Sequence, residues 1–169
     1  MNNIILTGMP AAGKSTIGRL LAKKTGYKFL DTDHLIESGE GKKLSQIISQ
    51  NGLKNFVDLE ERYVLTVSGE KKIIATGGSV VYGKMAMEHL SKIGTIIYLS
   101  LDLSNLLKRI NSLSKRGVVI EDGKSFKDLF NERTKLYENY ADYTVDCYNK
   151  NPLEISNEIR NHVEGTSNN

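Results

Sequence analysis

The glycine-rich segment from Gly8 to Thr16 carries the clearest chemical signal in this sequence. It reads Gly-Met-Pro-Ala-Ala-Gly-Lys-Ser-Thr and fits the pattern Gly-x-x-x-x-Gly-Lys-Ser/Thr of a phosphate-binding loop. An apolar run of strand length precedes it and a run with helical apolar spacing follows it, so loop amides and a helix N-terminus can face an anion together. In such loops the lysine reaches the outer phosphates of a nucleoside triphosphate, and the hydroxyl that follows binds Mg²⁺. Lys14 and Ser15 are therefore predicted to hold a nucleoside triphosphate and its magnesium ion.

Two carboxylates, Asp31 and Asp33, directly follow the second predicted strand. They would emerge at the same edge of a parallel sheet as the phosphate loop, and alternation along a strand would point both side chains the same way. Phosphoryl transfer needs an acid that supports the Mg²⁺ waters and an acceptor that orients or deprotonates the attacking hydroxyl. The alternative is that Thr32 or Asp33 caps a short helix, and one residue could serve both purposes.

Weaker signals follow the third predicted strand and lie on a later helix. The turn Gly77-Gly78-Ser79 could present amides to an anion at a helix start, although a glycine pair after a strand most often marks only a turn. Arg133 lies within the predicted helix Phe126–Tyr140. Helix arginines are usually solvated, so residue type alone does not assign a role to Arg133.

The segment from 113 to 125 lacks a clear periodicity, is basic at its start and contains two glycines. A long irregular segment inside a compact domain is uncommon unless it is functional, which favours a mobile lid over the alternative of an idle surface loop. Arg116 in this segment could then approach a transferring phosphate and stabilise its spread-out charge.

Strand-like apolar runs alternate with runs of helical periodicity. The predicted strands are Asn3–Thr7, Lys28–Leu30, Lys72–Thr76, Thr95–Ser100 and Tyr143–Cys147, and the predicted helices are Lys14–Thr25, Leu44–Gln50, Asn55–Ser68, Lys84–Lys92, Leu103–Ser112, Phe126–Tyr140 and Leu153–Val163. This alternation predicts an α/β three-layer sandwich with a five-stranded parallel sheet and right-handed crossovers.

The sequence is expected to form one domain over residues 1–169. The stretch between the second and third strands, about 32–62, holds more helix than one crossover needs and is predicted to be an acceptor-binding insertion. The polar residues 164–169 are predicted to be frayed.

Composition limits the possible partners. A net charge of +3 argues against nucleic-acid binding as the main task, and the longest apolar runs are too short to cross a bilayer. The one cysteine, Cys147, lies in a strand-like run and fits a packing role in a reducing compartment. The three histidines, His34, His89 and His162, lack metal-ligand spacing. We expect a cytoplasmic protein, monomeric, with no membrane or nucleic-acid partner.

Taken in order, the motifs resemble those of the shikimate kinase family, within the nucleoside-monophosphate-kinase-like group. They are the phosphate loop, Asp31-Thr32-Asp33, Gly77-Gly78, the lid Arg116 and Arg133-x-x-x-Tyr137. The likeness extends from about Asn3 to Val163. Many NTPases share the phosphate loop, whereas the ordered combination is far more specific.

The resemblance implies a P-loop kinase fold and Mg²⁺-dependent transfer of the γ-phosphoryl group of ATP to shikimate, giving shikimate 3-phosphate for aromatic amino-acid biosynthesis. It implies catalytic roles for Lys14, Asp33 and Arg116, with Asp33 as the base for the attacked hydroxyl. The residues implied to bind ATP are Ala11, Ala12, Gly13, Lys14, Ser15, Thr16 and Arg116, with Arg109 and Pro152 at the adenine. Those implied to bind shikimate are Asp33, Phe56, Glu60, Gly77, Gly78 and Arg133. Ser15 would bind Mg²⁺ directly and Asp31 through water.

This sequence departs from the family pattern at three places. Where the family has Gly-Glu-x-x-Phe-Arg, residues 52–57 read Gly-Leu-Lys-Asn-Phe-Val, so Val57 replaces an arginine that pairs with the substrate carboxylate. Loss of one charge-assisted hydrogen bond, about 1.5–3 kcal/mol, predicts about ten- to hundredfold weaker carboxylate binding. Ser79 ends a turn that is Gly-Gly-Gly in the family, and the lid's Arg-Pro-Leu-Leu is replaced at 116–119 by Arg-Gly-Val-Val, which should loosen the lid more than disable it.

These departures leave three functions open. Lys54, one helical turn before Val57, could supply the missing cation for shikimate. The acceptor could instead be another small hydroxy acid or polyol, such as gluconate or homoserine, or a nucleotide. A non-catalytic nucleotide-binding protein that kept the fold is the third alternative. Release of ADP that depends on a particular acceptor would separate the three.

Overall fold

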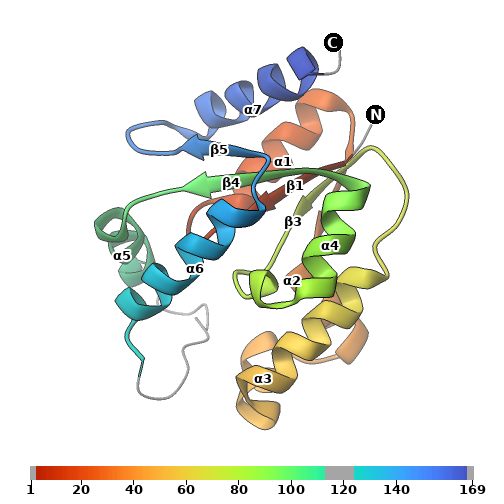
Figure 1. The fold of residues 1–169 in the computed structure, drawn as a ribbon, viewed down its shortest axis with the longest axis vertical. Coiled ribbons are helices and arrows are strands. Elements are labelled where there is room, and N and C mark those ends of the chain that lie inside the picture. The colour runs from red at the N-terminus through yellow and green to blue at the C-terminus, as the bar shows by residue number, and fades with distance from the viewer. Residues whose placement is uncertain (1–2, 113–123, 167–169) are drawn as a thin grey trace.

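The computed structural model describes residues 3–112 and 124–166, which form a parallel sheet with helices on both faces (Figure 1). The five strands are β1 (Asn3–Thr7), β2 (Lys28–Asp31), β3 (Lys72–Ala75), β4 (Gly94–Ser100) and β5 (Tyr143–Asp146), in the order β2-β3-β1-β4-β5. All four neighbouring pairs are parallel. The predicted three-layer architecture is confirmed, with strand ends shifted by one residue at most.

The centre of the sheet is built from strands that are apolar on both faces. Ile4, Ile5 and Leu6 of β1 pair with β3 on one side and β4 on the other, and all three are fully buried. Continuous β-branched runs of this kind suit a central parallel strand, because helices cover both of its faces. This buried core therefore fixes the positions of the carboxyl ends of β1 and β3, where the loops that follow these strands begin.

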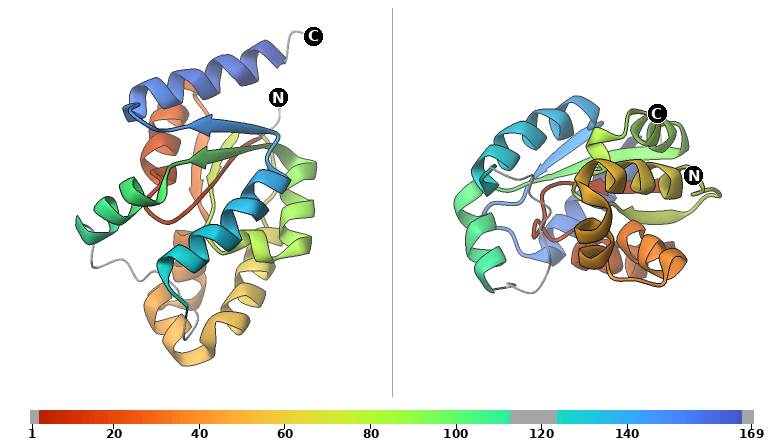
Figure 2. Two further views of the ribbon diagram at one scale, coloured as in Figure 1. Left: turned by 60° about the vertical axis from the view of Figure 1, so that its left-hand side comes forward. Right: turned by 90° about the horizontal axis from the view of Figure 1, so that it is seen from below.

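Within residues 3–112 and 124–166, eight helical elements connect and extend these strands. They are α1 (Lys14–Thr25), α2 (Thr32–Glu40), α3 (Leu44–Leu65), the 3₁₀ turn η1 (Val80–Tyr82), α4 (Lys84–Ile93), α5 (Leu103–Ser112), α6 (Phe126–Tyr140) and α7 (Pro152–Thr166). Helices α1 and α7 pack together on one face of the sheet, whereas α4 and α6 cover the other face (Figures 1 and 2). Helix α3 lies at the bottom of Figure 1, and α2 packs against it.

In the predicted insertion, helix α3 contains the two helices predicted at Leu44–Gln50 and Asn55–Ser68, separated by a kink. Helix α3 joins them through Gly52, whose backbone is non-helical at φ 74° and ψ 165°. Glycine can adopt this positive φ at little cost, so Gly52 accommodates the kink between the two helical parts. Helices α2 and α3 share a small apolar cluster of their own, which contains Ile36, Ile47 and Phe56.

The short helix α2 was foreseen only as a capping alternative, and its cap is neither Thr32 nor Asp33. The carboxylate of Asp31 accepts a hydrogen bond from the backbone N–H of Asp33 at 3.1 Å and thereby caps the helix. Asp33 therefore lies in the first helical turn, so strand alternation does not set its direction as expected. The side chains of Asp31 and Asp33 nevertheless line the same cavity.

Two segments were predicted to be irregular, the lid at 113–125 and the tail at 164–169. Helix α7 continues to Thr166, so residues 164–166 are helical where fraying was predicted. Residues 113–123, including Arg116, lie outside the described residues. Immediately after them, Ser125 caps α6 through a reciprocal pair of hydrogen bonds with Asp128.

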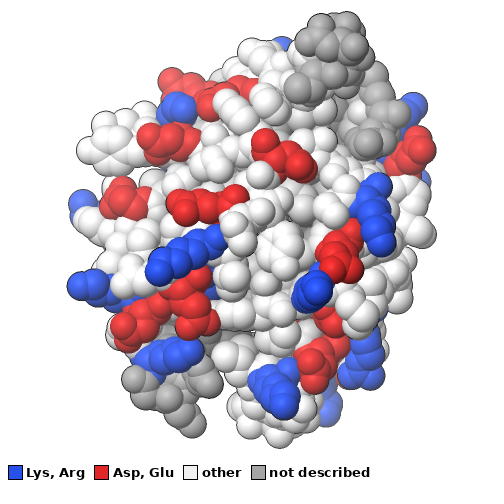
Figure 3. Space-filling model, viewed as in Figure 1, with Lys and Arg blue, Asp and Glu red and all other residues white. Residues whose placement is uncertain are grey.

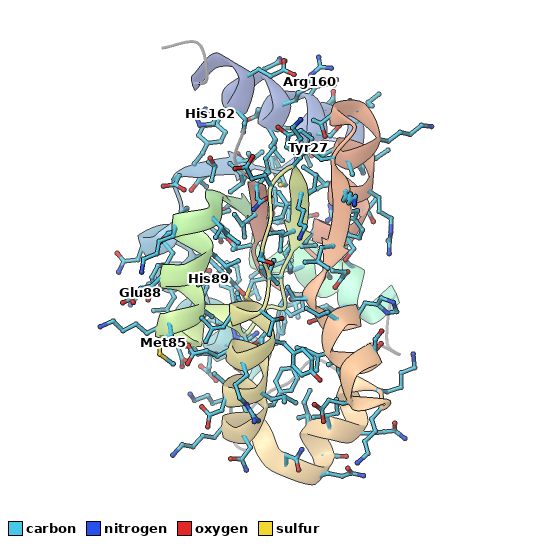
Figure 4. All side chains as sticks on the ribbon, turned by 90° about the vertical axis from the view of Figure 1, so that its right-hand side faces the viewer. Tyr27, Met85, Glu88, His89, Arg160 and His162 are labelled. Carbon is cyan, nitrogen blue, oxygen red and sulfur yellow. The ribbon has the colours of Figure 1, made fainter. Side chains whose placement is uncertain are left out.

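The surface charges and the remaining polar residues bear on the predictions made from composition. On the face drawn in Figure 3, acidic and basic side chains are interspersed. Over residues 3–112 and 124–166, no cluster of three or more potential metal ligands occurs, and no helix is long and apolar enough to span a membrane. His89 lies on α4 and His162 on α7 (Figure 4). Cys147 is buried and packs in the main core, as predicted.

Candidate active site

A cavity of about 430 Å³ lies beyond the carboxyl ends of the strands. The candidate residues that line it come from the phosphate loop, the start of α2, the turn after β3 and helices α3, α5, α6 and α7. They are Ala11, Ala12, Gly13, Lys14, Ser15, Thr16, Asp31, Asp33, Phe56, Gly77, Gly78, Arg109, Arg133 and Pro152. Every described candidate except Glu60 therefore borders one space. The carboxyl edge of an open parallel sheet is where ligands of such folds bind.

The phosphate loop is shaped by residues that the strands force close together. Gly8 has φ +143°, and a Cβ there would lie 2.8 Å from the carbonyl oxygen of Leu99 in β4, so only glycine fits. Ala11 and Gly13 also have positive φ, at 67° and 104°. The loop then enters α1, whose first-turn N–H groups and dipole favour an anion at this place.

Lys14 is held inside the loop. Its ammonium donates hydrogen bonds to the carbonyl oxygens of Gly8 at 2.7 Å and Met9 at 3.0 Å. Burial lowers the pKa of Lys14 to about 8, and the neighbouring carboxylate of Asp33 partly opposes that fall. Burial of the charged ammonium therefore costs desolvation free energy, and a negatively charged phosphate would compensate this cost.

Ser15 and Asp31 form a polar pair next to this lysine. The Ser15 hydroxyl donates to Oδ2 of Asp31 at 2.7 Å, while Oδ1 of Asp31 caps α2. A hydroxyl and a carboxylate are hard oxygen donors of the kind that Mg²⁺ prefers. Asp31 thus joins the phosphate loop to the element that carries Asp33.

Arg133 enters the cavity from α6, and its side chain is only 2% exposed. Its Nε donates to the Tyr82 hydroxyl at 3.3 Å, and its guanidinium lies 5.1 Å from the centre of the Tyr82 ring. Among the described residues, Nη2 is buried without a hydrogen-bond partner, and no carboxylate forms an ion pair with Arg133. A buried cation of this kind favours an anionic ligand.

Glu60 lies behind the glycine turn and does not line the cavity itself. Its Oε2 accepts a 2.5 Å hydrogen bond from Ser79, while Oε1 is buried with no partner within the described part of the chain. A Cβ on Gly77 would collide with Oε1 and lie 2.7 Å from Oδ1 of Asp33, so glycine lets both carboxylates approach the turn. Burial raises the pKa of Glu60 to about 8, and the Ser79 hydrogen bond opposes the rise.

The opposite end of the cavity is bounded by Arg109, Pro152 and Lys150. Arg109 Nη1 donates to the carbonyl oxygens of Ala11 and Ala12, at 3.2 and 3.3 Å, and so braces the phosphate loop. Lys150 pairs with Glu158 at 2.7 Å. The sequence analysis missed Lys150, and its position two residues before Pro152 was the only signal.

The three residues around the missing family arginine differ in exposure. Phe56 is 3% exposed and lines the cavity. Val57 is partly buried and Lys54 is exposed, and neither belongs to the cavity lining. The apolar wall is completed by Leu44 and Ile48, which the sequence analysis did not single out.

Comparison with known proteins identifies the family. Residues 10–164 match the family model described as Shikimate kinase. A shikimate kinase of Persephonella marina is 36% identical over 164 residues, covering 96% of this chain and 99% of the relative. The chain belongs to the shikimate kinase family. The family predicted from the motifs is therefore confirmed. Members of this family are ATP-dependent phosphotransferases.

Solved shikimate kinases share the fold over almost the whole chain. The Acinetobacter baumannii enzyme, solved in complex with shikimate, superposes with a TM-score of 0.90 at 28% identity and covers 98% of this chain and 94% of its own. The Aquifex aeolicus enzyme gives 0.83 at 30% identity and covers 98% of both chains. The P-loop kinase fold that the sequence predicted is therefore confirmed.

Two side chains that support the shikimate kinase site had a weak signal or none in the sequence. Tyr137 ends the Arg-x-x-x-Tyr motif, and its hydroxyl donates to the carbonyl oxygen of Gly78 at 2.5 Å. It also stacks on Tyr98 of β4, so it links the glycine turn to the sheet. Tyr82 follows that turn by four residues, and no pattern in the sequence distinguished it.

Proposed function

We propose that this protein catalyses transfer of the γ-phosphoryl group of ATP to a hydroxyl of shikimate. The observation that carries the proposal is the position of Arg133. A buried guanidinium, whose Nη2 has no partner among the described residues, lines the same cavity as Lys14 and Asp33. It would bind the acceptor carboxylate at one end while Asp33 meets the acceptor hydroxyl and Lys14 meets the phosphates. Family membership supports shikimate as that acceptor.

Each charged group would have a defined role in the transfer. Asp33 would orient the attacking hydroxyl and accept its proton, because its carboxylate lines the cavity near the lysine. Lys14 would stabilise the charge that spreads over the phosphate oxygens. Gly77 and Gly78 would let the acceptor approach the backbone, with Glu60 supporting that turn from behind. Arg116 would add a second cation from the lid.

The nucleotide would occupy the cavity between the phosphate loop and Pro152. Backbone N–H groups of Ala12 to Thr16 would bind its phosphates, and Arg109 and Pro152 would pack against the adenine. Ser15 and Asp31 suit Mg²⁺, because they place a hydroxyl and a carboxylate side by side at the loop. When bound, the ion would neutralise phosphate charge. A cytoplasmic, monomeric enzyme remains a prediction.

Val57 favours a second candidate, a kinase of the same type with a different hydroxylated acid as its acceptor. The family arginine at this position is replaced by an aliphatic side chain, and Lys54 is exposed outside the lining. The acceptor site therefore retains one described arginine where the family pattern has two. An acceptor with a smaller or differently placed anionic group would need no second arginine.

A coupled ADP-release assay with ATP, Mg²⁺ and a panel of hydroxy acids and polyols tests the proposal. We expect saturable ADP release that depends on shikimate, and the Asp33→Asn variant should lower kcat by about 10²–10⁴-fold with little change in ATP KM. Asp58→Asn, an exposed carboxylate on α3, is the matched control and should keep full activity. Turnover with another acceptor alone would select the second candidate. ADP release that no acceptor accelerates would contradict both.

A further inference from the structure

Tyr82 makes two contacts that hold the guanidinium of Arg133, which also lies beside the hydroxyl of Tyr137. Its hydroxyl accepts a hydrogen bond from Nε at 3.3 Å, and its ring lies against the guanidinium at 5.1 Å. A cation over an aromatic ring and a hydrogen bond at Nε together fix both the position and the plane of the group. Among residues 3–112 and 124–166, no carboxylate forms an ion pair with the guanidinium of Arg133.

The hydroxyl of Tyr82 is itself oriented. It donates to Oε1 of Glu132 at 2.6 Å, and Oε2 of Glu132 is paired with Lys124 at 3.0 Å. Burial, together with the hydrogen bond to Glu132, raises the pKa of Tyr82, so its hydroxyl stays protonated at neutral pH. Because its proton is directed at Glu132, an oxygen lone pair remains to accept the Nε–H of Arg133.

This arrangement selects the edge of Arg133 that a ligand can use. With Nε bonded to Tyr82, the Nη1–Nη2 edge is left for a bidentate carboxylate. Nη1 lies beside Gly78, since a Cβ there would be 3.1 Å away from it, and Nη2 is buried without a partner in the described structure. The edge that faces the glycine turn is thus the one with unmet hydrogen-bonding capacity.

Tyr82 lies four residues after Gly78 of the cavity-lining turn. It ends η1, which begins one residue after Ser79, so the turn and the tyrosine belong to one short, continuous segment. Helix α6 packs on this same segment and brings Arg133 to it. The packing of α6 on η1 therefore brings the side chains of Tyr82 and Arg133 into contact.

On the basis of the function proposed above, we propose that Tyr82 is a positioning residue that presents the Nη1–Nη2 edge of Arg133 to the acceptor carboxylate. Pre-ordering a long side chain lowers the entropy lost on binding. This matters most where Val57 leaves a single described arginine at the acceptor end. The hydroxyl and the ring act on acceptor binding, not on the phosphoryl-transfer step.

The test replaces the tyrosine hydroxyl and measures the two substrates separately. We expect Tyr82→Phe to raise the shikimate KM by about two- to tenfold, the range of one net hydrogen bond, with kcat and ATP KM unchanged. Isothermal titration calorimetry of shikimate should show the same loss of affinity. Tyr63→Phe is the matched control, because Tyr63 also donates to a glutamate, Glu40, at 2.9 Å and lies away from the cavity lining. It should leave every constant unchanged.

A double-mutant cycle with Arg133→Ala shows whether the tyrosine acts through the arginine. We expect Arg133→Ala alone to raise the shikimate KM about ten- to hundredfold, and Tyr82→Phe to add nothing in its absence. Additive effects would overturn the proposal, as would an unchanged shikimate KM in Tyr82→Phe. If the unaltered protein neither binds nor phosphorylates shikimate, the proposed function fails together with this inference. Activity in the unaltered protein with an unaffected Tyr82→Phe rejects the inference alone.

Discussion

The two ends of the cavity differ in whether their polar groups have hydrogen-bond partners within the described residues. At the phosphate loop, Lys14 donates to two carbonyl oxygens and Ser15 donates to Asp31, so the charged groups already have partners within the chain. At the acceptor end, Oε1 of Glu60 and Nη2 of Arg133 are buried without partners in the described residues. The first end is ordered by its own hydrogen bonds, whereas the second keeps hydrogen-bonding capacity that a ligand could satisfy.

The difference follows from how each end is encoded. The phosphate loop is one continuous segment between β1 and α1, and most of its contacts use backbone atoms. The acceptor end draws Phe56 and Glu60 from α3, Gly78 from a loop and Arg133 from α6. Unmet buried groups cost free energy in the ligand-free state. We infer that acceptor binding recovers part of that cost and so gains selectivity for a ligand that supplies both an anion and hydroxyl groups.

Loss of the Lys14 charge should have the largest effect and tests whether the phosphate-loop end governs the chemical step. We expect Lys14→Met to lower kcat by at least about a thousandfold, because a cation that stabilises the transferring phosphoryl group contributes on that order. The shikimate affinity measured by calorimetry should change little. Lys28→Met, at an exposed position on the edge strand β2, is the control and should retain activity. If the main defect of Lys14→Met were a loss of shikimate affinity, the two ends would not have separate roles in the chemical step and in acceptor binding.

Restoring the family arginine should have an intermediate effect, confined to the acceptor end. If shikimate is the acceptor, Val57→Arg should lower its KM by about ten- to hundredfold, since it would add one charge-assisted hydrogen bond. The ATP KM should not change. Steady-state kinetics with each substrate varied at saturation of the other will show this.

Lys54→Ala is the companion variant to Val57→Arg. Lys54 is exposed and outside the cavity lining, so we expect this change to leave the shikimate KM unaltered. A rise would show that the lysine replaces the missing arginine. No gain from Val57→Arg, with activity on another acceptor, would instead point to a different anionic substrate.

The same contrast explains what could be predicted from the sequence. The phosphate loop, the strand segments of the parallel sheet and the family were predictable, because local motif, apolar runs and glycine positions all agree there. The cap of α2 was misassigned because Asp31, Thr32 and Asp33 are all capable of capping, and only tertiary contacts choose among them. Thr32 instead accepts a hydrogen bond from the backbone N–H of Gly77.

The contacts of the acceptor end could not be predicted in the same way. Tyr82 and Arg133 are 51 residues apart, and the pairing of Glu60 with Ser79 spans 19. Neither pair has a sequence spacing that would distinguish it from unrelated surface residues. Arg133 was identified through the family motif, whereas Tyr82 depended on the packing of α6 against the turn after β3.

The smallest expected effect is on stability. It tests whether the unpartnered buried groups at the acceptor end lower the free energy of unfolding of the ligand-free protein. Burial raises the pKa of Glu60 to about 8 in the folded protein, from an ordinary value of 4.5. Between these two pH values the folded protein keeps a proton that the unfolded chain has released, so the free energy of unfolding falls as the pH rises. Lys14, whose pKa is lowered from 10.5 to about 8, has the opposite effect, but only above about pH 8.

Thermal unfolding of the ligand-free protein between pH 5 and pH 8 isolates this contribution. Glu60→Gln removes the titration, so its Tm relative to the unaltered protein should rise steadily with pH, and a stability gain of 1 kcal/mol would appear as about 2–4 °C in a domain of this size. Glu88→Gln, which alters an exposed residue paired with Lys84 at 3.9 Å, should show a constant difference across the range. A constant difference for Glu60→Gln as well would mean that its carboxylate is ionised throughout. The acceptor end would then be as well compensated as the phosphate loop.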